Sequence, residues 1–375
     1  MSESEKAPLQ RPAAWGLELA DWNQVVKALL IPAYRAKQIW HGLQEQLIRS
    51  WDELSSLPID LRHMLVERFD VAALTVAEIT ETPDGVRKLL STCRDGELIE
   101  SVLIPSEDRW TLCISSQAGC AFGCAFCASG KAGLSRNLVA GEIVGQALLA
   151  ARWLRETIEQ AEPAPVQPGS PKPMRPPLLR PGNVVVMGMG EPLANYDEVL
   201  KALRILNAPN GLGIGARHIT ISTCGVVPGI RRLAEEGFQF ELSVSLHAPS
   251  DALRTRLMPV NKRWPMHELI AACRDYTAKT NRIITFEYTL VRGVNDQPAQ
   301  ARELAELLSS WNCRVNLIPL SPVAEYTGEA PDEATCLAFQ NILKSSRIHT
   351  TLRRSRGRGV DAACGQLRLR RKAGL

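Results

Sequence analysis

Three cysteines on one short stretch, Cys120, Cys124 and Cys127, give this sequence its clearest chemical signal. Their spacing is C-x3-C-x2-C, and no fourth cysteine is close by in the chain. A structural zinc site normally has four protein ligands, whereas a cubic iron–sulfur cluster takes one thiolate per iron. Three thiolates would therefore hold a 4Fe–4S cluster and leave one iron open to a substrate. Gly119 and Gly123 favour a loop around a cofactor over buried or zinc-binding cysteines, because glycine permits tight turns.

The same spacing, with the aromatic Phe126 just before the last cysteine, resembles the radical S-adenosylmethionine (SAM) superfamily. The resemblance implies that the open iron chelates the amino and carboxylate groups of SAM. It also implies that an electron from the cluster cleaves SAM to a 5′-deoxyadenosyl radical. The expected cofactors are one 4Fe–4S cluster and SAM, with a flavodoxin-like or ferredoxin-like protein as the electron donor.

The composition, with 22% charged and 45% hydrophobic residues among 375, is that of an ordinary globular protein with ample length for a core. The first residues contain no apolar stretch of signal-peptide length, and no segment approaches the roughly 18 to 20 apolar residues of a membrane span. We therefore expect a cytoplasmic protein that does not enter a membrane, and we expect it to act as a monomer. Its 10 cysteines would be reduced in the cytoplasm, so the spacing of these cysteines indicates metal binding or catalysis rather than disulfides.

Charge is unevenly distributed along the chain. The net charge is +4, but nine basic residues and a single acid, Asp361, fall between Arg347 and Leu375. A basic stripe on an otherwise mildly acidic protein is typical of a nucleic-acid contact, although a solvated tail has the same composition. A cysteine inside this stretch, Cys364, favours a functional role.

The first third of the chain divides into two parts. Apolar residues at helical spacing between Asp21 and Phe69 predict a helical accessory domain over residues 1–72. Short β-rich runs separated by Pro-Asp-Gly and Asp-Gly turns then predict a β-meander, a connector over residues 73–105.

The core domain, residues 106–357, alternates between strand and helix patterns. Six strands are predicted, at Trp110–Ser115, Asn183–Met187, His218–Ser222, Glu241–Leu246, Ile283–Val291 and Arg314–Ile318, with helices between them. Repeated β-then-α units imply a parallel sheet, so we expect an α/β fold with a partial (β/α)6 barrel. Eight prolines make residues 163–182 an exposed insertion rather than a partner-binding segment. Residues 358–375 would form a C-terminal tail that carries Cys364.

Active sites of such sheets lie at the C-terminal ends of the strands, and the cysteine loop follows the first strand. Small or polar residues at the ends of the later strands are therefore candidate SAM contacts: Gly190, Glu191, Ser222, Ser245, Leu246, His247 and Asn316. Glu191 offers a carboxylate for an ammonium group. Ser222 and Ser245 could instead cap the next helices, and His247 could have a structural role.

Five longer segments resemble the RlmN/Cfr family of radical SAM adenine methyltransferases. They are Cys113–Cys120, Gly133–Leu138, Gly188–Pro192, Ser245–Pro249 and Asp361–Leu367, and the resemblance runs from about Tyr34 to Leu367. It implies methylation of carbon 2 of adenine in large-subunit (23S) rRNA and in tRNA next to the anticodon, with the helical domain binding RNA. The Pro-rich insertion and the arginine-rich end depart from the family pattern but touch no matched motif.

The same resemblance assigns three catalytic residues. Carbon 2 of adenine has no usable lone pair, so it cannot attack the methyl group of SAM directly. By analogy with the family, one SAM methylates the Cys364 thiolate, a second is cleaved at the cluster, and a methylene radical on Cys364 joins the adenine. Glu100 matches the base that takes the ring proton. Cys113 matches the thiol that attacks the Cys364 sulfur, which frees the RNA and leaves a disulfide.

Two other functions stay open at this level. A Cfr-like enzyme would methylate carbon 8 of the same rRNA adenine. A non-catalytic iron–sulfur protein that binds RNA would use the helical domain and the basic tail, but it would not need the thiol pair of Cys113 and Cys364. The remaining cysteines are expected to be small buried residues, namely Cys93, Cys224, Cys273, Cys313 and Cys336.

Overall fold

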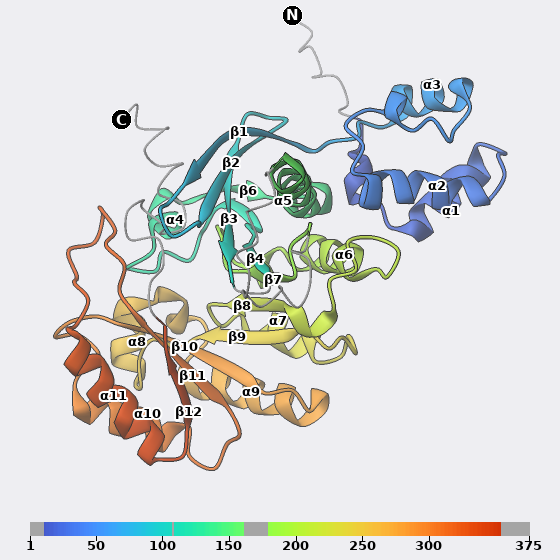
Figure 1. Ribbon diagram of the computed structural model, residues 1–375. Coiled ribbons are helices and arrows are strands. Elements are labelled where there is room, and N and C mark those ends of the chain that lie inside the picture. Colours follow the sequence, from blue (N-terminus) through green and yellow to red (C-terminus); the bar gives the residue numbers. More distant parts are fainter. Residues whose placement is uncertain (1–10, 107–108, 161–178, 354–375) are drawn as a thin grey trace, which may run out of the picture.

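The computed structural model describes residues 11–106, 109–160 and 179–353 (Figure 1). The C-terminal tail with Cys364 and most of the Pro-rich insertion lie outside the described residues. No helix in the described part of the chain is long and apolar enough to cross a membrane.

The N-terminal module is helical, as the sequence predicts. It consists of α1 (Leu19–Ala28), α2 (Tyr34–His41) and α3 (Ile59–Arg68), with short 3-10 turns at Ala14–Gly16 and Trp51–Glu53 and a π-helical turn at Gly42–Gln46. The buried Trp22 ring contacts Trp51 and Phe69, with ring centroids 6.0 and 5.1 Å apart. These large aromatic contacts supply much of the core of a module whose helices are short.

The rest of the chain builds one ten-stranded sheet and one two-stranded sheet. In spatial order the large sheet contains β1 (Leu74–Glu81), β2 (Arg87–Cys93), β3 (Leu98–Pro105), β4 (Trp110–Cys113), β7 (Asn183–Val186), β8 (Ile219–Thr223), β9 (Glu241–Ser245), β10 (Ile284–Leu290), β11 (Arg314–Pro319) and β12 (His349–Leu352). Strands β1 to β4 pair antiparallel, which confirms the predicted meander. The seven strands of this sheet from β4 to β12 pair in parallel. The small sheet pairs β5 (Gln117–Gly119) with β6 (Leu134–Asn137).

Helices connect the parallel strands and cover the sheet. They are α4 (Ala128–Ala132), α5 (Ala140–Gln160), α6 (Tyr196–Asn207), α7 (Val227–Leu233), α8 (Asp251–Leu257), α9 (Met266–Thr280), α10 (Pro298–Leu307) and α11 (Glu333–Ser345), with 3-10 turns at Pro192–Ala194, Ala216–His218 and Pro259–Lys262. The N-terminal module lies beside α5 and α6 at one side of the molecule (Figure 1).

The two faces of the parallel sheet differ in chemistry, because successive strand residues point to opposite sides. One face is apolar and packs in the main core with the helices; its buried side chains include Leu112, Val184, Ile221, Val244, Phe286 and Leu317. The alternate positions of the later strands are mostly polar, among them Ser222, Ser243, Ser245, Glu287 and Asn316. We call this second, polar side the inner face. It is the side on which a polar cofactor could be held.

The predicted α/β fold with a partial barrel is confirmed, and each of the six predicted strands forms. A seventh parallel strand, β12, is not predicted by the sequence analysis. Its four residues alternate between exposed and partly or fully buried positions and include two threonines, so they form no apolar run. Pairing with β11 makes this segment a strand.

Candidate functional site

The three cysteines lie between β5 and α4, in the loop that follows β4. Gly123 within the loop has a φ of +60°, which glycine adopts without strain. The Ala125 N–H donates to Leu257 O at 2.9 Å, and this bond fastens the loop to the end of α8. The loop is thus held at the carboxyl side of the sheet, where the sequence predicts it.

The electrostatics of the loop suit a group that binds thiolates. Burial raises the pKa of Cys120 to about 12 and also raises the pKa of Cys124, and the charge of Cys127 adds to both shifts. Negative charges on neighbouring thiolates repel one another, so the three side chains must lie near each other. The charged form of all three is disfavoured when no metal is bound. Bound iron would reverse this preference, because a coordinating thiol is deprotonated outright. Across the described ranges, no three Cys, His, Asp or Glu side chains are close enough together to hold a metal ion. The fit to a cluster therefore rests on the shared loop and the donor chemistry.

Two glycines after β7 bring the backbone close to the segment that precedes the cysteines. A Cβ on Gly188 would lie 2.7 Å from the backbone of Ile114. Gly190 has a φ of +99°, and a Cβ there would lie 2.5 Å from Gln117 Cβ. Gly188 is therefore required because a side chain would collide with the backbone of Ile114. Gly190 is required both to avoid a collision with Gln117 and because its positive φ favours glycine.

Glu191 is buried beside the cysteine loop. Its carboxylate accepts hydrogen bonds from the backbone N–H groups of Leu193 at 3.0 Å and Cys224 at 2.7 Å. Burial raises the pKa of Glu191, and its charge contributes to the raised pKa values of Cys120 and Cys124. A carboxylate in this position is well placed for the ammonium group of a ligand next to the cysteines.

Among the cysteines outside the predicted ligand set, Cys224 differs from the others. Four are buried as predicted, namely Cys93, Cys273, Cys313 and Cys336. Cys224 is only partly buried and follows β8, where its raised pKa reflects burial first and then the charges of Glu191 and Cys124. About a hundred residues separate it from the loop in sequence, so spacing alone gives no sign of this proximity. No two cysteines of the described residues are joined by a disulfide.

Ser222 and Ser245 do not cap the helices that follow them. Ser222 lies within β8 and Ser245 ends β9, whereas the residues that precede α7 and α8 are Val226 and Ser250. Ser222 is in register with Ser243 on the neighbouring strand, one level below Ser245 on the inner face. The capping alternative is therefore wrong for both serines, and they stay candidate cofactor contacts.

His247 holds the chain after β9. Its φ is +57°, and its Nδ1 accepts a hydrogen bond from the Thr289 N–H at 2.8 Å. Burial lowers the pKa of His247 to about 3, so the ring is neutral and can accept this bond. The ring also makes an edge contact with Phe126 of the cysteine loop, with centroids 4.9 Å apart. Leu246, the preceding residue, donates its N–H to Glu287 O at 3.0 Å.

Asn316 lies across the sheet from Ser245, with one strand between them. Glu287 on β10 is the register partner of both residues. The Asn316 amide nitrogen donates to the Glu287 carboxylate at 2.8 Å, and Thr351 Oγ1 donates to the Asn316 amide oxygen at 2.9 Å. The sequence analysis predicts Ser245 and Asn316 but not Glu287.

Arg254 on α8 is a second residue that the sequence analysis misses. It is fully buried, and its guanidinium donates to Cys224 O at 2.7 Å, to Ser245 O at 3.1 Å and to Asn261 Oδ1 at 2.8 Å. These bonds join the carboxyl ends of β8 and β9. Burial lowers the pKa of Arg254, while the charges of Cys224 and Cys124 oppose that shift. An arginine in a helix normally indicates an exposed position, so only the packing identifies this one.

Replacing Arg254 with methionine should lower the free energy of unfolding by roughly 3 kcal/mol, because one buried and two partly buried acceptors lose their donor. Arg256→Met is the matched control, since Arg256 is exposed on the same helix and should change stability by no more than about 0.5 kcal/mol. Urea unfolding of both variants under anaerobic conditions measures the difference. Equal losses in the two variants would show that the Arg254 bonds contribute nothing specific.

Glu100 and Cys113 lie together on the inner face of the first strands. Cys113 ends β4 in register with Val102, and Glu100 is two residues before Val102 on β3, so its side chain is on the same face. Glu100 is 3% exposed, with Lys88 Nζ 4.0 Å from its carboxylate. A surface position for Glu100 is thereby excluded. Their predicted partner Cys364 is outside the described residues.

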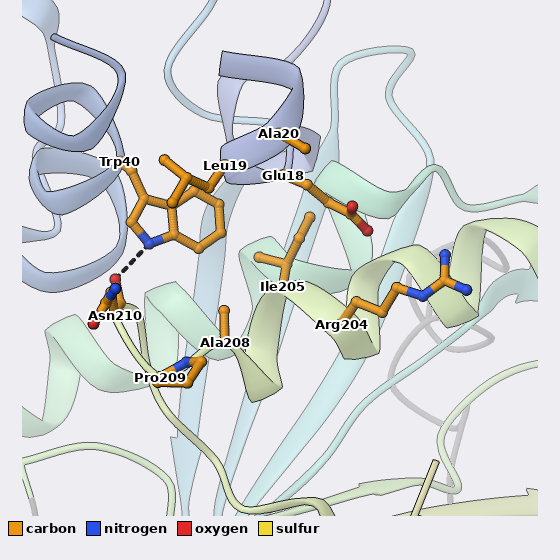
Figure 2. Close-up of a pocket in the computed structure, with 9 residues that line it drawn as sticks. All are labelled: Glu18, Leu19, Ala20, Trp40, Arg204, Ile205, Ala208, Pro209 and Asn210. Atoms are coloured by element: carbon orange, nitrogen blue, oxygen red, sulfur yellow. Dashed lines mark hydrogen bonds between the residues drawn. The ribbon is translucent and has the colours of Figure 1, made fainter. Parts of the chain in front are cut away.

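A pocket of about 230 Å³ lies elsewhere, between the N-terminal module and α6 (Figure 2). Leu19 and Trp40 line it on one side, and Arg204 and Asn210 on the other. The Trp40 Nε1–H donates to Asn210 O across it. No predicted site residue lines this pocket, so it is separate from the site at the strand ends.

Comparison with known proteins agrees with the geometry. The Radical SAM superfamily matches residues 178–305. A relative from Gemmatimonas aurantiaca, named "Probable dual-specificity RNA methyltransferase RlmN", is 46% identical over 340 residues, which cover 91% of this chain and 87% of the relative. A relative of the same name from Symbiobacterium thermophilum is 44% identical over 370 residues, covering 97% and 93%. The crystal structure of a radical SAM methyltransferase from Sphaerobacter thermophilus has a TM-score of 0.87 at 45% identity, covering 95% of this chain and 98% of that one. The chain therefore belongs to the RlmN family of radical SAM methyltransferases.

Proposed function

We propose that this protein forms 2-methyladenosine in 23S rRNA and in tRNA next to the anticodon. The observation that carries the proposal is the inner face itself. It brings a buried carboxylate, Glu100, and a thiol, Cys113, onto one side of the sheet whose strand ends carry the cysteine loop. The names of relatives up to 46% identical support RNA as the substrate.

The cofactors would occupy the carboxyl ends of the strands. Cys120, Cys124 and Cys127 would hold the 4Fe–4S cluster, and SAM would contact Gly190, Glu191, Ser222, Ser245, Leu246, His247 and Asn316. When bound and reduced by a flavodoxin-like or ferredoxin-like donor, the cluster with SAM supplies a 5′-deoxyadenosyl radical. The Glu191 carboxylate, held by the N–H groups of Leu193 and Cys224, would accept a hydrogen bond from the ammonium group of SAM.

The chain's own residues would then carry the methyl group. The Cys364 thiolate accepts a methyl group from SAM, that methyl group gives up one hydrogen atom to the 5′-deoxyadenosyl radical, and the remaining methylene carbon joins carbon 2 of the adenine. Glu100 takes the proton from that ring carbon, and the Lys88 Nζ lies 4.0 Å from its carboxylate. Cys113 attacks the Cys364 sulfur, which frees the methylated RNA and leaves a disulfide for a reductant to reopen.

Product analysis tests the proposal. Protein reconstituted anaerobically with iron and sulfide, then reduced, is incubated with SAM and either a 23S rRNA fragment or tRNA. Digestion to nucleosides and mass spectrometry against authentic standards should show 2-methyladenosine from both RNAs. 8-Methyladenosine would indicate the Cfr-like reaction, and RNA binding with neither product would indicate a non-catalytic protein. Methylation of only one RNA would contradict the dual specificity.

A further inference from the structure

Glu287 is a buried carboxylate to which the proposed function gives no role. It lies in β10 on the inner face and is 6% exposed. Its register partners are Ser245 on β9 and Asn316 on β11, so it lies directly between two predicted SAM contacts. A carboxylate is rarely buried unless its oxygens are bonded, and its bonds therefore indicate what it does there.

The Glu287 side chain determines which way the Asn316 amide points. The Asn316 Nδ2 donates to Glu287 Oε2 at 2.8 Å, and the Asn316 Oδ1 accepts from Thr351 Oγ1 at 2.9 Å. An ionised carboxylate only accepts hydrogen bonds, and in the structure it faces the NH2 end of the amide. Rotating the amide by half a turn would set two acceptors against each other. The amide oxygen keeps one further lone pair for a donor on a ligand.

The Glu287 backbone holds the segment that follows β9. Its carbonyl oxygen accepts from the N–H groups of Leu246 at 3.0 Å and His247 at 3.3 Å. These two residues follow Ser245, and the His247 ring contacts Phe126 of the cysteine loop. Glu287 on β10 thereby connects the segment after β9 with Asn316 on β11.

Two hydrogen-bond donors and one cation surround the Glu287 carboxylate. Burial raises the pKa of Glu287, whereas the hydrogen bond from Asn316, the charge of Arg353 and the hydroxyl of Ser243 lower it. Three neighbours thus stabilise the charged form against the effect of burial. These three neighbours lie on β9, on β11 and directly after β12.

We propose that Glu287 is a positioning residue for SAM, which acts by holding the Asn316 amide so that its oxygen is presented to a hydroxyl or amino donor of SAM. The inference rests on the proposed function, in which Asn316 contacts SAM. A residue that merely supported the core would weaken SAM binding, if at all, independently of Asn316. The two possibilities therefore differ in how the effects of two substitutions combine.

A double-mutant cycle on SAM affinity separates them. Equilibrium dialysis measures the dissociation constant for SAM on the anaerobically reconstituted, unreduced protein, so that no turnover occurs. Asn316→Ala and Glu287→Ala should each raise this constant about 10-fold, and the double variant should be no weaker than Asn316→Ala alone. Glu287→Gln, whose amide oxygen can still accept from Asn316, should stay within about threefold of the parent protein.

Iron content and the thermal unfolding midpoint establish that each variant is folded and loaded. Thr285→Val is the matched control, because Thr285 lies one level below Glu287 on the same face, and SAM affinity should not change. If Glu287→Ala does not fold, Thr351→Val tests the same amide from the other end. It should weaken SAM binding about threefold in the parent protein and leave the Asn316→Ala variant unchanged.

The possible failures are distinct. If Asn316→Ala leaves SAM affinity unchanged, the Asn316 contact in the proposed function is wrong. If Asn316→Ala weakens binding but Glu287→Ala does not, or if the two effects multiply to about 100-fold, the positioning role of Glu287 is wrong while the proposed function stands. If Glu287→Ala does not fold, no change in Thr351→Val likewise overturns the positioning role.

Discussion

Replacing Cys113 with alanine is expected to leave the protein covalently attached to its RNA. In the proposed reaction Cys113 acts last, after Cys364 has received the methyl group and joined the adenine. Without the Cys113 thiol, nothing attacks the Cys364 sulfur, so the adduct accumulates. Cys113 ends β4 on the inner face, the same face as Glu100, which is the base in the proposed reaction. Multiple-turnover product formation should fall at least about 100-fold.

Cys364→Ala should give the opposite result, because the residue that carries the methyl group is gone. Each variant is incubated with RNA, SAM and reductant and then run on a denaturing gel. A ribonuclease-sensitive conjugate should form with Cys113→Ala and not with Cys364→Ala. Cys93→Ala is the matched control, since Cys93 is a buried strand cysteine on the apolar side of the sheet and should turn over normally. A conjugate with Cys364→Ala, or free methylated RNA at the normal rate from Cys113→Ala, would show that the two roles are wrongly assigned.

Replacing Cys124 with alanine should abolish both SAM cleavage and RNA methylation. The chain would then supply two loop thiolates, too few to hold a cubic cluster with a single open iron. Iron and sulfide analysis should show that the cluster is lost, and chromatography after reduction should show no 5′-deoxyadenosine above the background of free iron and dithionite. We expect a loss of at least about 1,000-fold in cleavage.

Cys224→Ser is the informative control for this experiment. Cys224 is close enough to Cys124 and Glu191 for their charges to raise its pKa, but it lies outside the three-residue loop motif. Its variant should keep about four irons per chain and cleave SAM. Loss of the cluster from Cys224→Ser would place this cysteine in the ligand set. Cleavage at the normal rate by Cys124→Ala would remove Cys124 from it.

Local spacing was enough to predict most elements of this fold and the site residues that belong to short motifs. A strand shows itself by alternation or by an apolar run, and each predicted strand of the core is present within a few residues of its expected bounds. The cysteine loop is equally local, because Cys120, Cys124 and Cys127 lie within eight consecutive positions. The position of this loop after the first parallel strand followed from the order of elements.

Tertiary structure alone decided which distant residues meet. Glu287 lies in the middle of β10 as the single charged residue of that strand, between Phe286 and Tyr288. Only the register with β9 and β11 places it between Ser245 and Asn316. Arg254 has the sequence signature of an exposed helix face, and burial under the ends of β8 and β9 reverses that expectation. The proximity of Cys224 to the cysteine loop and the pairing of β12 with β11 likewise depend on tertiary contacts, so the sequence did not predict them.

The physical reason is the range over which each signal acts. Alternation, turn chemistry and ligand spacing depend on neighbours a few residues away, and the sequence contains them directly. Burial, register and hydrogen-bond partners depend on segments brought together by closing loops of tens of residues, and those contacts appear in no local pattern. The sequence of this protein therefore determined most of its elements and the spacing of its cysteine loop, whereas the packing of parallel strands decided the pairing of β12 and the environment of Glu287, Arg254 and Cys224.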